Sequence, residues 1–168
     1  MRAYARIFDG MRKRSAGILM FRHAGEELEV LLVHPGGPYW ARKDAGAWTI
    51  PKGEYTDDEE AFVAAMREFS EETGCVPAGD PAKDFLALGD IRQKGGKTVS
   101  AWAVEGAFDC ATLTSNSFEL EWPPRSGKRQ SFPEVDRAAW FPIAQARLKI
   151  LPSQSPFIDR LVAAVARP

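Results

Sequence analysis

Residues 53–75 read Gly-Glu-Tyr-Thr-Asp-Asp-Glu-Glu-Ala-Phe-Val-Ala-Ala-Met-Arg-Glu-Phe-Ser-Glu-Glu-Thr-Gly-Cys, and this stretch predicts a helix with two different faces. At about 100° per residue, one stripe of the helix is apolar and contains Phe62, Met66 and Phe69. A separate sector of about 100° is acidic and contains Glu68, Glu71 and Glu72. We therefore expect the apolar stripe to pack on a sheet while the three carboxylates point to a common place.

Local signals predict where this helix begins and ends. Thr56 and Glu59 have the spacing of a capping box, so we expect Thr56 to be the N-cap. The acidic run 57–60 also favours the positive end of the helix dipole. Gly74 can adopt the left-handed conformation that commonly follows a last helical turn, and it therefore predicts the C-terminal end.

The crowding of three carboxylates needs an explanation, because like charges three or four residues apart on a helix repel each other. A solvated acidic surface is the ordinary explanation for such a helix. It does not account for the presence of Glu59, Arg67 and two flanking glycines in the same stretch. Binding of a hard cation would account for the crowded carboxylates, because Mg²⁺ is usually held by a few carboxylates together with the phosphates of a substrate. The pattern therefore favours a magnesium–phosphate site.

The complete pattern is Gly, five residues, Glu, seven residues, Arg-Glu, an apolar residue, any residue, Glu-Glu, any residue, Gly and an apolar residue. Residues 53–75 fill it without a gap, and only Cys75 departs from the usual aliphatic residue. This pattern resembles the Nudix box, the signature of the Nudix hydrolase family. The resemblance implies an α/β/α sandwich with a mixed sheet. It also implies an enzyme that uses Mg²⁺ or Mn²⁺ to hydrolyse a nucleoside diphosphate linked to another group.

The resemblance and the chemistry together suggest roles for the charged residues of the box. We expect Glu68 and Glu72 to be direct metal ligands. Glu71 is expected to be a further ligand or a partner of the ligands, with a plain surface carboxylate as the alternative. Arg67 is expected to orient the carboxylates through a bidentate pair, with Glu59 as its partner.

Residues around the helix are expected to complete the site. Gly53 either lets a backbone carbonyl approach the metal or serves only a local turn. Lys52 can reach a phosphate as a point charge, although a lone lysine is often simply solvated. Glu134 lies six residues before Trp140, and the resemblance implies a further catalytic or metal-binding glutamate in this loop. Glu134 is therefore our first candidate for the base that activates water, and Glu68 is the second.

The choice of substrate is less strongly marked in the sequence. Segments 48–53 and 97–102, together with Glu134, look like the diadenosine polyphosphate hydrolase branch of the family. An aromatic platform is needed for the base, and the candidates, each of which could instead be a core residue, are Tyr39, Trp40 and Trp102. The basic residues that could steer a polyphosphate, or could simply be solvated, are Arg125, Lys128 and Arg129.

Other substrates remain open because the same box also serves several related reactions. The resemblance is compatible with clearance of oxidised nucleotides, hydrolysis of nucleotide sugars and hydrolysis of diphosphoinositol polyphosphates. It is also compatible with an inactive binding module, although such modules usually lose acidic positions that are all present here.

The composition of the chain limits the kinds of protein that it can be. The chain has 168 residues, of which 45% are hydrophobic, which suits one domain with a sizeable core. A net charge of −1 predicts no general attraction to nucleic acid or membrane, so we expect a nucleotide-type small molecule as the partner. Cys75 and Cys110 do not make a disulfide framework, and no secretory signal or membrane span is recognised. These features favour a reducing cytoplasm and leave the oligomeric state open.

The remainder of the chain predicts an α/β domain. Apolar runs, alternation and turn signals indicate strands at 15–22, 27–34, 47–50, 85–93, 97–105, 117–122 and 138–141. Two further helices are predicted at 142–150 and 157–166. Helices alternating with strands in this way fit a sandwich with a mixed sheet. We expect residues 1–14 to be a flexible extension, 15–168 to be a single domain and 123–130 to be an inserted basic loop.

Overall fold

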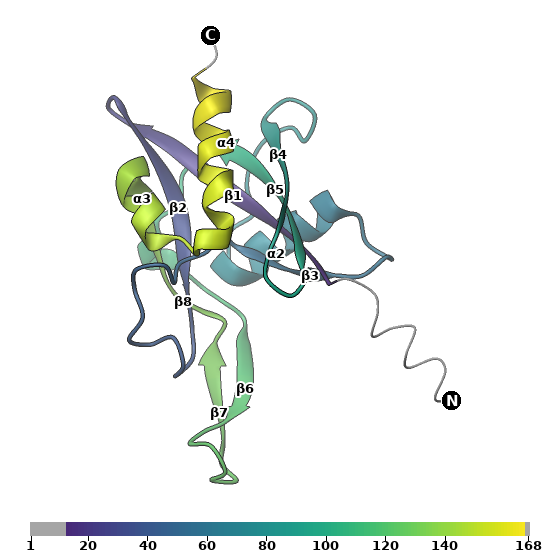
Figure 1. Cartoon of the computed structure of the whole chain (residues 1–168), viewed down its shortest axis with the longest axis vertical. Helices are drawn as coiled ribbons and strands as arrows, with labels where there is room; N and C mark the ends of the chain where they lie inside the picture. The colour runs from purple at the N-terminus through teal and green to yellow at the C-terminus, as the bar shows by residue number, and fades with distance from the viewer. Residues whose placement is uncertain (1–12, 167–168) are drawn as a thin grey trace.

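The computed structural model describes residues 13–166, and its centre is a six-stranded mixed sheet (Figure 1). The strand order is β4-β5-β1-β2-β8, and β3 pairs with β1. The strands are β1 (Arg14–Ala24), β2 (Glu27–Pro35), β3 (Lys52–Tyr55), β4 (Phe85–Arg92), β5 (Thr98–Glu105) and β8 (Val135–Pro142). β1 is parallel to β5 and antiparallel to β2 and β3. Its nearly continuous apolar sequence agrees with a central position covered on both faces.

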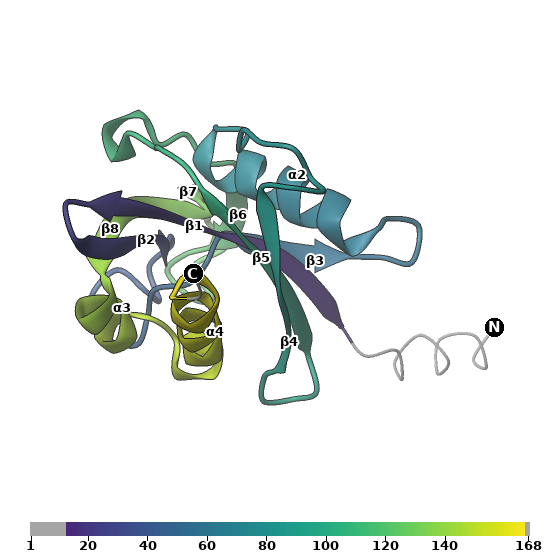
Figure 2. The same cartoon turned by 90° about the horizontal axis from the view of Figure 1, so that it is seen from above.

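Helices cover both faces of this sheet (Figure 2). One face carries α2 (Ala61–Thr73), and the other carries α3 (Ile143–Lys149) and α4 (Ser155–Val165). On the α2 side, the core includes Ala16, Ile18, Met20, Ala64, Ala65 and Phe69. On the opposite side, it includes Leu19, Phe21, Phe157, Ile158 and Leu161. Alternate residues of β1 thus enter opposite cores, as the pleat of a strand requires, and the predicted α/β/α sandwich is confirmed.

The short strand predicted at 47–50 is replaced by an irregular segment with two isolated bridges. One bridge joins Thr49 to Val33, and the other joins Trp48 to the residue after α3. The regular strand in this part of the chain is β3, which starts only after Pro51. Because proline has no N–H to donate to a strand ladder, regular pairing with β1 begins beyond it.

The capping box predicted for α2 is wrong. The helix begins at Ala61, with Glu60 as the N-cap and no side-chain capping hydrogen bond. A turn precedes it, in which the Glu59 N–H donates to the Thr56 carbonyl at 3.2 Å. The Glu59 carboxylate is bound to Arg67 instead, so it does not fold back to complete a capping box.

The other helix boundaries agree more closely with the sequence. Gly74 ends α2 with a φ of 80°, in the left-handed conformation that was predicted. Pro142 is the N-cap of α3 rather than its first helical residue. The last helix, α4, begins at Ser155, and a short 3-10 helix, η2 (Pro152–Gln154), connects it to α3.

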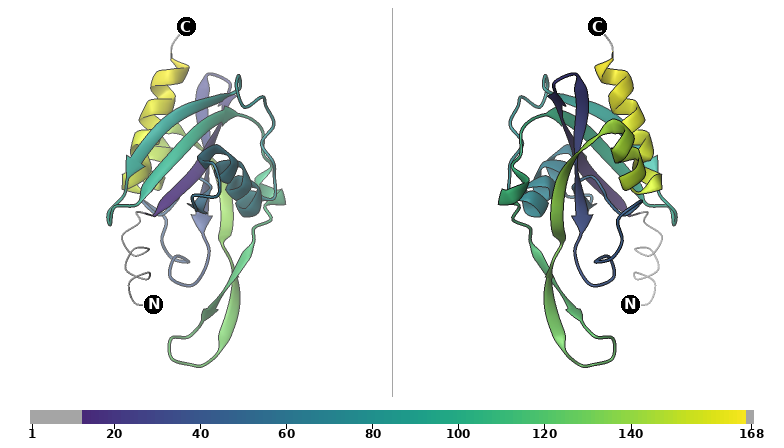
Figure 3. Two further views of the ribbon diagram at one scale, coloured as in Figure 1. Left: turned by 90° about the vertical axis from the view of Figure 1, so that its right-hand side faces the viewer. Right: turned by 90° about the vertical axis from the view of Figure 1, so that its left-hand side faces the viewer.

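The segment predicted as an inserted basic loop belongs to a β-hairpin. β6 (Ser117–Glu121) pairs with β7 (Arg129–Pro133) to form a separate two-stranded sheet, which projects from the body of the domain (Figures 1 and 3). The alternating sequence of β6 predicted a strand, whereas that of β7, Arg-Gln-Ser-Phe-Pro, gives no such signal. Pairing with β6 makes β7 a strand, and only residues 122–128 remain as a loop.

The structure describes only the last two residues of the N-terminal extension expected at 1–14. Arg14 is already the first residue of β1, and residues 1–12 lie outside the described part of the chain. Within residues 13–166, no helix combines the length and apolar character needed to span a membrane. Cys75 and Cys110 are both free thiols.

Candidate active site

Arg67 ties the acidic face of α2 together. Its guanidinium binds Glu59 in the expected bidentate arrangement, with N–O distances of 2.9 and 2.8 Å. The same guanidinium donates to Glu68 Oε1 at 2.9 Å and to Glu71 Oε2 at 3.2 Å. The fixed fork of arginine donors suits such multiple pairing. The hydrogen bond from Arg67 also lowers the pKa of Glu59, which keeps that carboxylate charged and Arg67 in place.

Glu68 lies against β3 at a position where only glycine leaves enough room. A Cβ atom on Gly53 would come within 2.0–2.3 Å of the Glu68 carboxylate. Gly53 lies inside β3 and is not among the glycines with positive φ, so the local turn considered from the sequence is not observed. Glycine is needed here for close approach. Burial raises the pKa of Glu68, and the hydrogen bond from Arg67 opposes that rise.

Glu72 is a half-buried carboxylate with a strongly raised pKa. Burial raises its pKa to about 8, while a hydrogen bond from the Lys52 backbone N–H opposes the rise. The N–O distance of that hydrogen bond is 3.1 Å. Repulsion from Glu68 and Glu134 raises the pKa of Glu72 further. A carboxylate perturbed by both burial and neighbouring charge is typical of a functional site.

A cavity of about 240 Å³ brings together residues from four separate parts of the chain. Lys52 from β3, Glu72 from α2, Glu134 from the β7–β8 junction and Trp40 from the loop after β2 all line it. Its remaining walls are formed by Val33, Pro35, Thr49, Val135 and Leu151. Burial lowers the pKa of Lys52 and raises that of Glu134. The structure therefore places two carboxylates and a cation, far apart in the sequence, around one space.

The backbone of Glu134 is held from both sides. Its N–H donates to the carbonyl of Asn116 at 2.7 Å, and its carbonyl accepts from the N–H of Gly36 at 2.9 Å. The N–H of Asn116 in turn donates to the carbonyl of Glu71 at 2.9 Å. These bonds connect α2, the base of the hairpin and the loop after β2. They fix the position of Glu134 relative to the acidic helix.

Four predicted substrate-binding residues do not line the cavity. Tyr39 is 58% exposed, and its ring centroid lies 5.3 Å from that of Trp122 on the hairpin. Trp102 packs against Phe62 of α2, with 5.4 Å between ring centroids. The other two, in the loop at the end of the hairpin, are Arg125 and Lys128. Trp40 is the aromatic candidate that lines the cavity. The apolar walls had no distinguishing signal, because their residues read as ordinary strand or loop residues.

The four carboxylates of the candidate site are suitable ligands for a hard divalent cation. Glu68, Glu71, Glu72 and Glu134 are close enough for charge on one to raise the pKa of another. Carboxylate oxygens are the ligands that Mg²⁺ prefers. Across residues 13–166, no three His, Cys, Asp or Glu side chains are already arranged to hold a metal ion. Because these carboxylates are bonded to Arg67 and to the Lys52 N–H, we expect their side chains to rearrange when a cation binds.

The raised pKa of Glu72 predicts a specific dependence of stability on pH in the absence of metal. Between its ordinary value of 4.5 and about 8, the folded state holds a proton on Glu72 that the unfolded state has lost. Stability attributable to this group therefore falls as pH rises through that range. We expect Glu72→Gln to raise the Tm at pH 8 by several °C, since about 1 kcal/mol shifts Tm by about 2–4 °C at this size.

Thermal unfolding in EDTA at pH 5 and at pH 8 measures this effect. The advantage of Glu72→Gln over the unsubstituted protein should grow between the two values. Glu60→Gln, on the exposed N-cap residue of the same helix, should show no such growth. An advantage that is the same at both pH values would contradict the prediction.

The three-layer sandwich, in which Glu72 of α2 shares one cavity with a lysine and a further glutamate, agrees with the pyrophosphohydrolase class predicted from the sequence. The sequence matches the family model described as the NUDIX domain over residues 11–161. The chain therefore belongs to the Nudix family. Among curated proteins, none matches it in sequence.

Solved structures of low sequence identity share the fold. A complex of the Caenorhabditis elegans Ap4A hydrolase has a TM-score of 0.62 and 20% identity, covering 92% of this chain and 98% of that one. The NUDIX domain of Shewanella oneidensis NrtR, in complex with ADP ribose, has a TM-score of 0.63 and 16% identity, covering 98% of both chains. The C-terminal domain of mouse MUTYH, in complex with human PCNA, has a TM-score of 0.57 and 15% identity, covering 94% and 92%.

Proposed function

We propose that the protein is a Mg²⁺-dependent hydrolase of the pyrophosphate linkage in a nucleoside diphosphate-linked substrate, specifically a dinucleoside polyphosphate such as diadenosine tetraphosphate. The observation that carries the proposal is the cavity in which Glu72, Lys52, Glu134 and Trp40 meet. It combines carboxylates for a cation, a lysine for phosphate, a second acid and an aromatic ring for a base.

In this proposal the residues of the acidic helix hold the cation. Glu68 and Glu72 are direct ligands, and Glu71 and the carbonyl of Gly53 are further candidates. Arg67 orients Glu68 and Glu71 through its hydrogen bonds. When bound, Mg²⁺ neutralises phosphate charge and lowers the pKa of a bound water; Mn²⁺ could serve in the same way.

The other cavity residues act on the substrate. The ammonium of Lys52 attracts a phosphate oxygen, and burial, which desolvates this charge, lowers the pKa of Lys52. Glu134 accepts the proton of the attacking water, and this role is favoured because burial and the Glu71 charge raise the pKa of Glu134. Glu68 is the alternative base. Trp40 provides a face on which an adenine could stack.

The choice of dinucleoside polyphosphate rests on similarity and on the shape of the chain around the site. Segments 48–53 and 97–102 look like the diadenosine polyphosphate hydrolase branch, and one structural neighbour is an Ap4A hydrolase. The hairpin begins at the base of the site, next to Glu134. In this proposal its exposed cations, Arg125 and Lys128, attract the distal part of a long polyanion, and Tyr39 contacts the second base. Trp102, packed against α2, has no contact with the substrate in this proposal.

A panel of substrates tests the function. Purified protein with Mg²⁺ is incubated with diadenosine tetraphosphate, an oxidised nucleoside triphosphate, a nucleotide sugar and a diphosphoinositol polyphosphate, and the products are identified by mass spectrometry. We expect AMP and ATP from diadenosine tetraphosphate and no product in EDTA. Faster hydrolysis of another compound would show that the substrate belongs to the class of that compound rather than to the dinucleoside polyphosphates. Absence of product from all four would contradict hydrolysis and favour a binding module.

A further inference from the structure

His34, near the end of β2, is completely buried and hydrogen-bonded at both ring nitrogens. Its Nδ1 lies 2.8 Å from Oδ1 of Asp136. Its Nε2 lies 2.6 Å from the backbone carbonyl oxygen of Lys43. The first partner is in β8 and the second is in the loop between β2 and β3. One side chain thus connects two segments that are far apart in the sequence.

The two partners of His34 are held by different parts of the fold. The Asp136 carboxylate is in β8, which pairs with β2, and the Lys43 carbonyl is in the backbone of the loop after β2. The ring therefore lies between a strand of the sheet and this loop.

Both segments that His34 connects contribute residues to the candidate active site. Lys43 is three residues beyond Trp40, and the Lys43 N–H donates to the Trp40 carbonyl at 2.9 Å. Trp40, Glu134 and Val135 all line the cavity. The segment with Glu134 is joined to the end of β2 by the β2–β8 ladder and by the bond from the Gly36 N–H. The bond from the His34 ring to the Lys43 carbonyl adds a tie between these strands and the loop with Trp40.

We propose that His34 is a positioning residue, which holds the loop 36–46, with Trp40, against the β8 side of the cavity through its contacts with Asp136 and Lys43. Its role is geometric, since losing the hydrogen bond to Lys43 releases this loop, whereas Glu134 stays tied to the end of β2 by backbone bonds. What the cavity encloses rests on the proposed function, whereas the anchoring of the loop does not.

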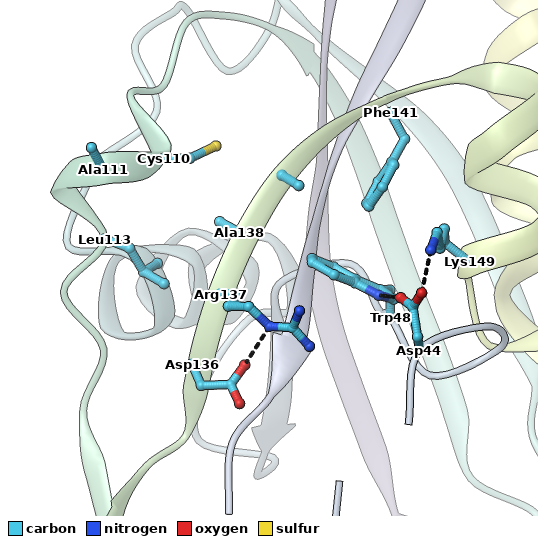
Figure 4. Close-up of a pocket in the computed structure, with 11 residues that line it drawn as sticks. Asp44, Trp48, Cys110, Ala111, Leu113, Asp136, Arg137, Ala138, Phe141 and Lys149 are labelled. Atoms are coloured by element: carbon cyan, nitrogen blue, oxygen red, sulfur yellow. Dashed lines mark hydrogen bonds and ion pairs between the residues drawn. The ribbon is translucent and has the colours of Figure 1, made fainter. Parts of the chain in front are cut away.

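Charged groups around His34 are themselves paired. Arg137 lies 3.6 Å from Asp136 and stacks over Trp48, whose ring packs edge-on against His34. On the other side of Trp48, Asp44 accepts from the indole N–H at 2.8 Å and also pairs with the Lys149 ammonium. Figure 4 shows the labelled members of this arrangement beside β8. The side chain of Lys43 is turned to the Trp40 ring, so its charge is directed elsewhere.

The main alternative is a histidine that only fills space against Trp48. The variant His34→Phe distinguishes the two, because it fills the same space beside Trp48 without any hydrogen-bonding group. A histidine that only fills space predicts that the loop 36–46 keeps its protection in this variant, and that result would overturn the proposal.

Hydrogen exchange tests the anchoring of the loop. His34→Phe keeps an aromatic ring but removes both ring nitrogens. We expect amide exchange at 36–46 to accelerate about tenfold or more, while 134–137, which is paired with β2, and α2 keep their protection. Asp136→Asn should accelerate exchange in the same loop. Asp159→Asn, at an exposed ion pair with Arg147, is the control and should leave it unchanged. Unchanged protection of the loop in the first two variants would contradict a positioning role.

Hydrolysis of diadenosine tetraphosphate provides the link to function. A displaced loop should lower kcat/KM by about tenfold or more in His34→Phe and Asp136→Asn, because a displacement of about 1 Å can cost about a hundredfold in rate. Asp159→Asn should leave it unchanged. Full kcat/KM in both of these variants would overturn the positioning role. If the unsubstituted protein hydrolyses nothing, the proposed function fails, and the exchange measurements still decide the role of His34.

Discussion

Replacing Glu72 by Gln is expected to reduce Mg²⁺-dependent hydrolysis by about 100- to 1,000-fold, the range found when one preorganised charge-stabilising group is removed from an active site. Glutamine keeps the size of the side chain and can still accept from the Lys52 N–H. It removes the negative charge that attracts the cation. The change should therefore be a loss of chemistry rather than of fold, and the same variant should be more stable than the unsubstituted protein in EDTA at pH 8.

Steady-state rates with diadenosine tetraphosphate over a range of Mg²⁺ concentrations measure this effect. The matched control is Glu60→Gln, which removes the same charge from the exposed N-cap residue of the same helix. It should retain nearly full activity, which would exclude a general effect of charge on α2. Retention of turnover by Glu72→Gln would show that Glu72 is not a ligand of the catalytic cation.

Gly53→Ala is expected to lower activity by about a hundredfold while changing stability little. The added Cβ would overlap the Glu68 carboxylate, and these clashing atoms are the end of a flexible side chain that can turn aside. The fold can therefore accommodate the methyl group, but Glu68 cannot keep its position. A displacement of about 1 Å in a catalytic group is sufficient for a rate loss of this size.

Gly17→Ala is the informative comparison, because this glycine of β1 is paired with Lys52, the residue before Gly53 in β3. A Cβ atom there would lie 2.5 Å from the backbone carbonyl oxygen of Pro51. Backbone atoms do not move aside cheaply, so we expect a loss of about 1–3 kcal/mol in stability. Thermal unfolding should thus separate the two variants. A large drop in Tm for Gly53→Ala with normal specific activity would contradict our interpretation of Gly53.

The acidic helix was the part of the site most accessible from sequence. The spacing of Phe62, Met66 and Phe69 predicted its buried face, and Gly74 predicted its end, because both signals are local. The predicted start of the helix was wrong for a reason that is not local. The Glu59 carboxylate is hydrogen-bonded to Arg67 and is therefore unavailable for capping. A residue with two good partners can satisfy only one, and sequence spacing does not say which.

The substrate side of the site was less predictable. Trp40 and Tyr39 are adjacent in the sequence and had equal claims, yet one lines the cavity and the other lies against the hairpin. β7 was missed because it has no alternating pattern of its own and is stabilised by pairing with β6. His34 marked only the end of a strand. Its role depends on Asp136, about a hundred residues later in the chain.

The sequence by itself determined the α/β class, because strand and helix patterns alternate along the chain. It also determined the two faces of α2 and the acidic residues on that helix, since periodicity and spacing within one helix are sufficient for these. Tertiary structure decided why residue 53 is glycine, which aromatic residue reaches the cavity, and that Lys52, Glu72 and Glu134 share it. It also decided which carboxylates are buried and how far the pKa of Glu72 rises. These properties depend on contacts and desolvation contributed by distant segments, and they exist only when the sheet and both helical layers have assembled.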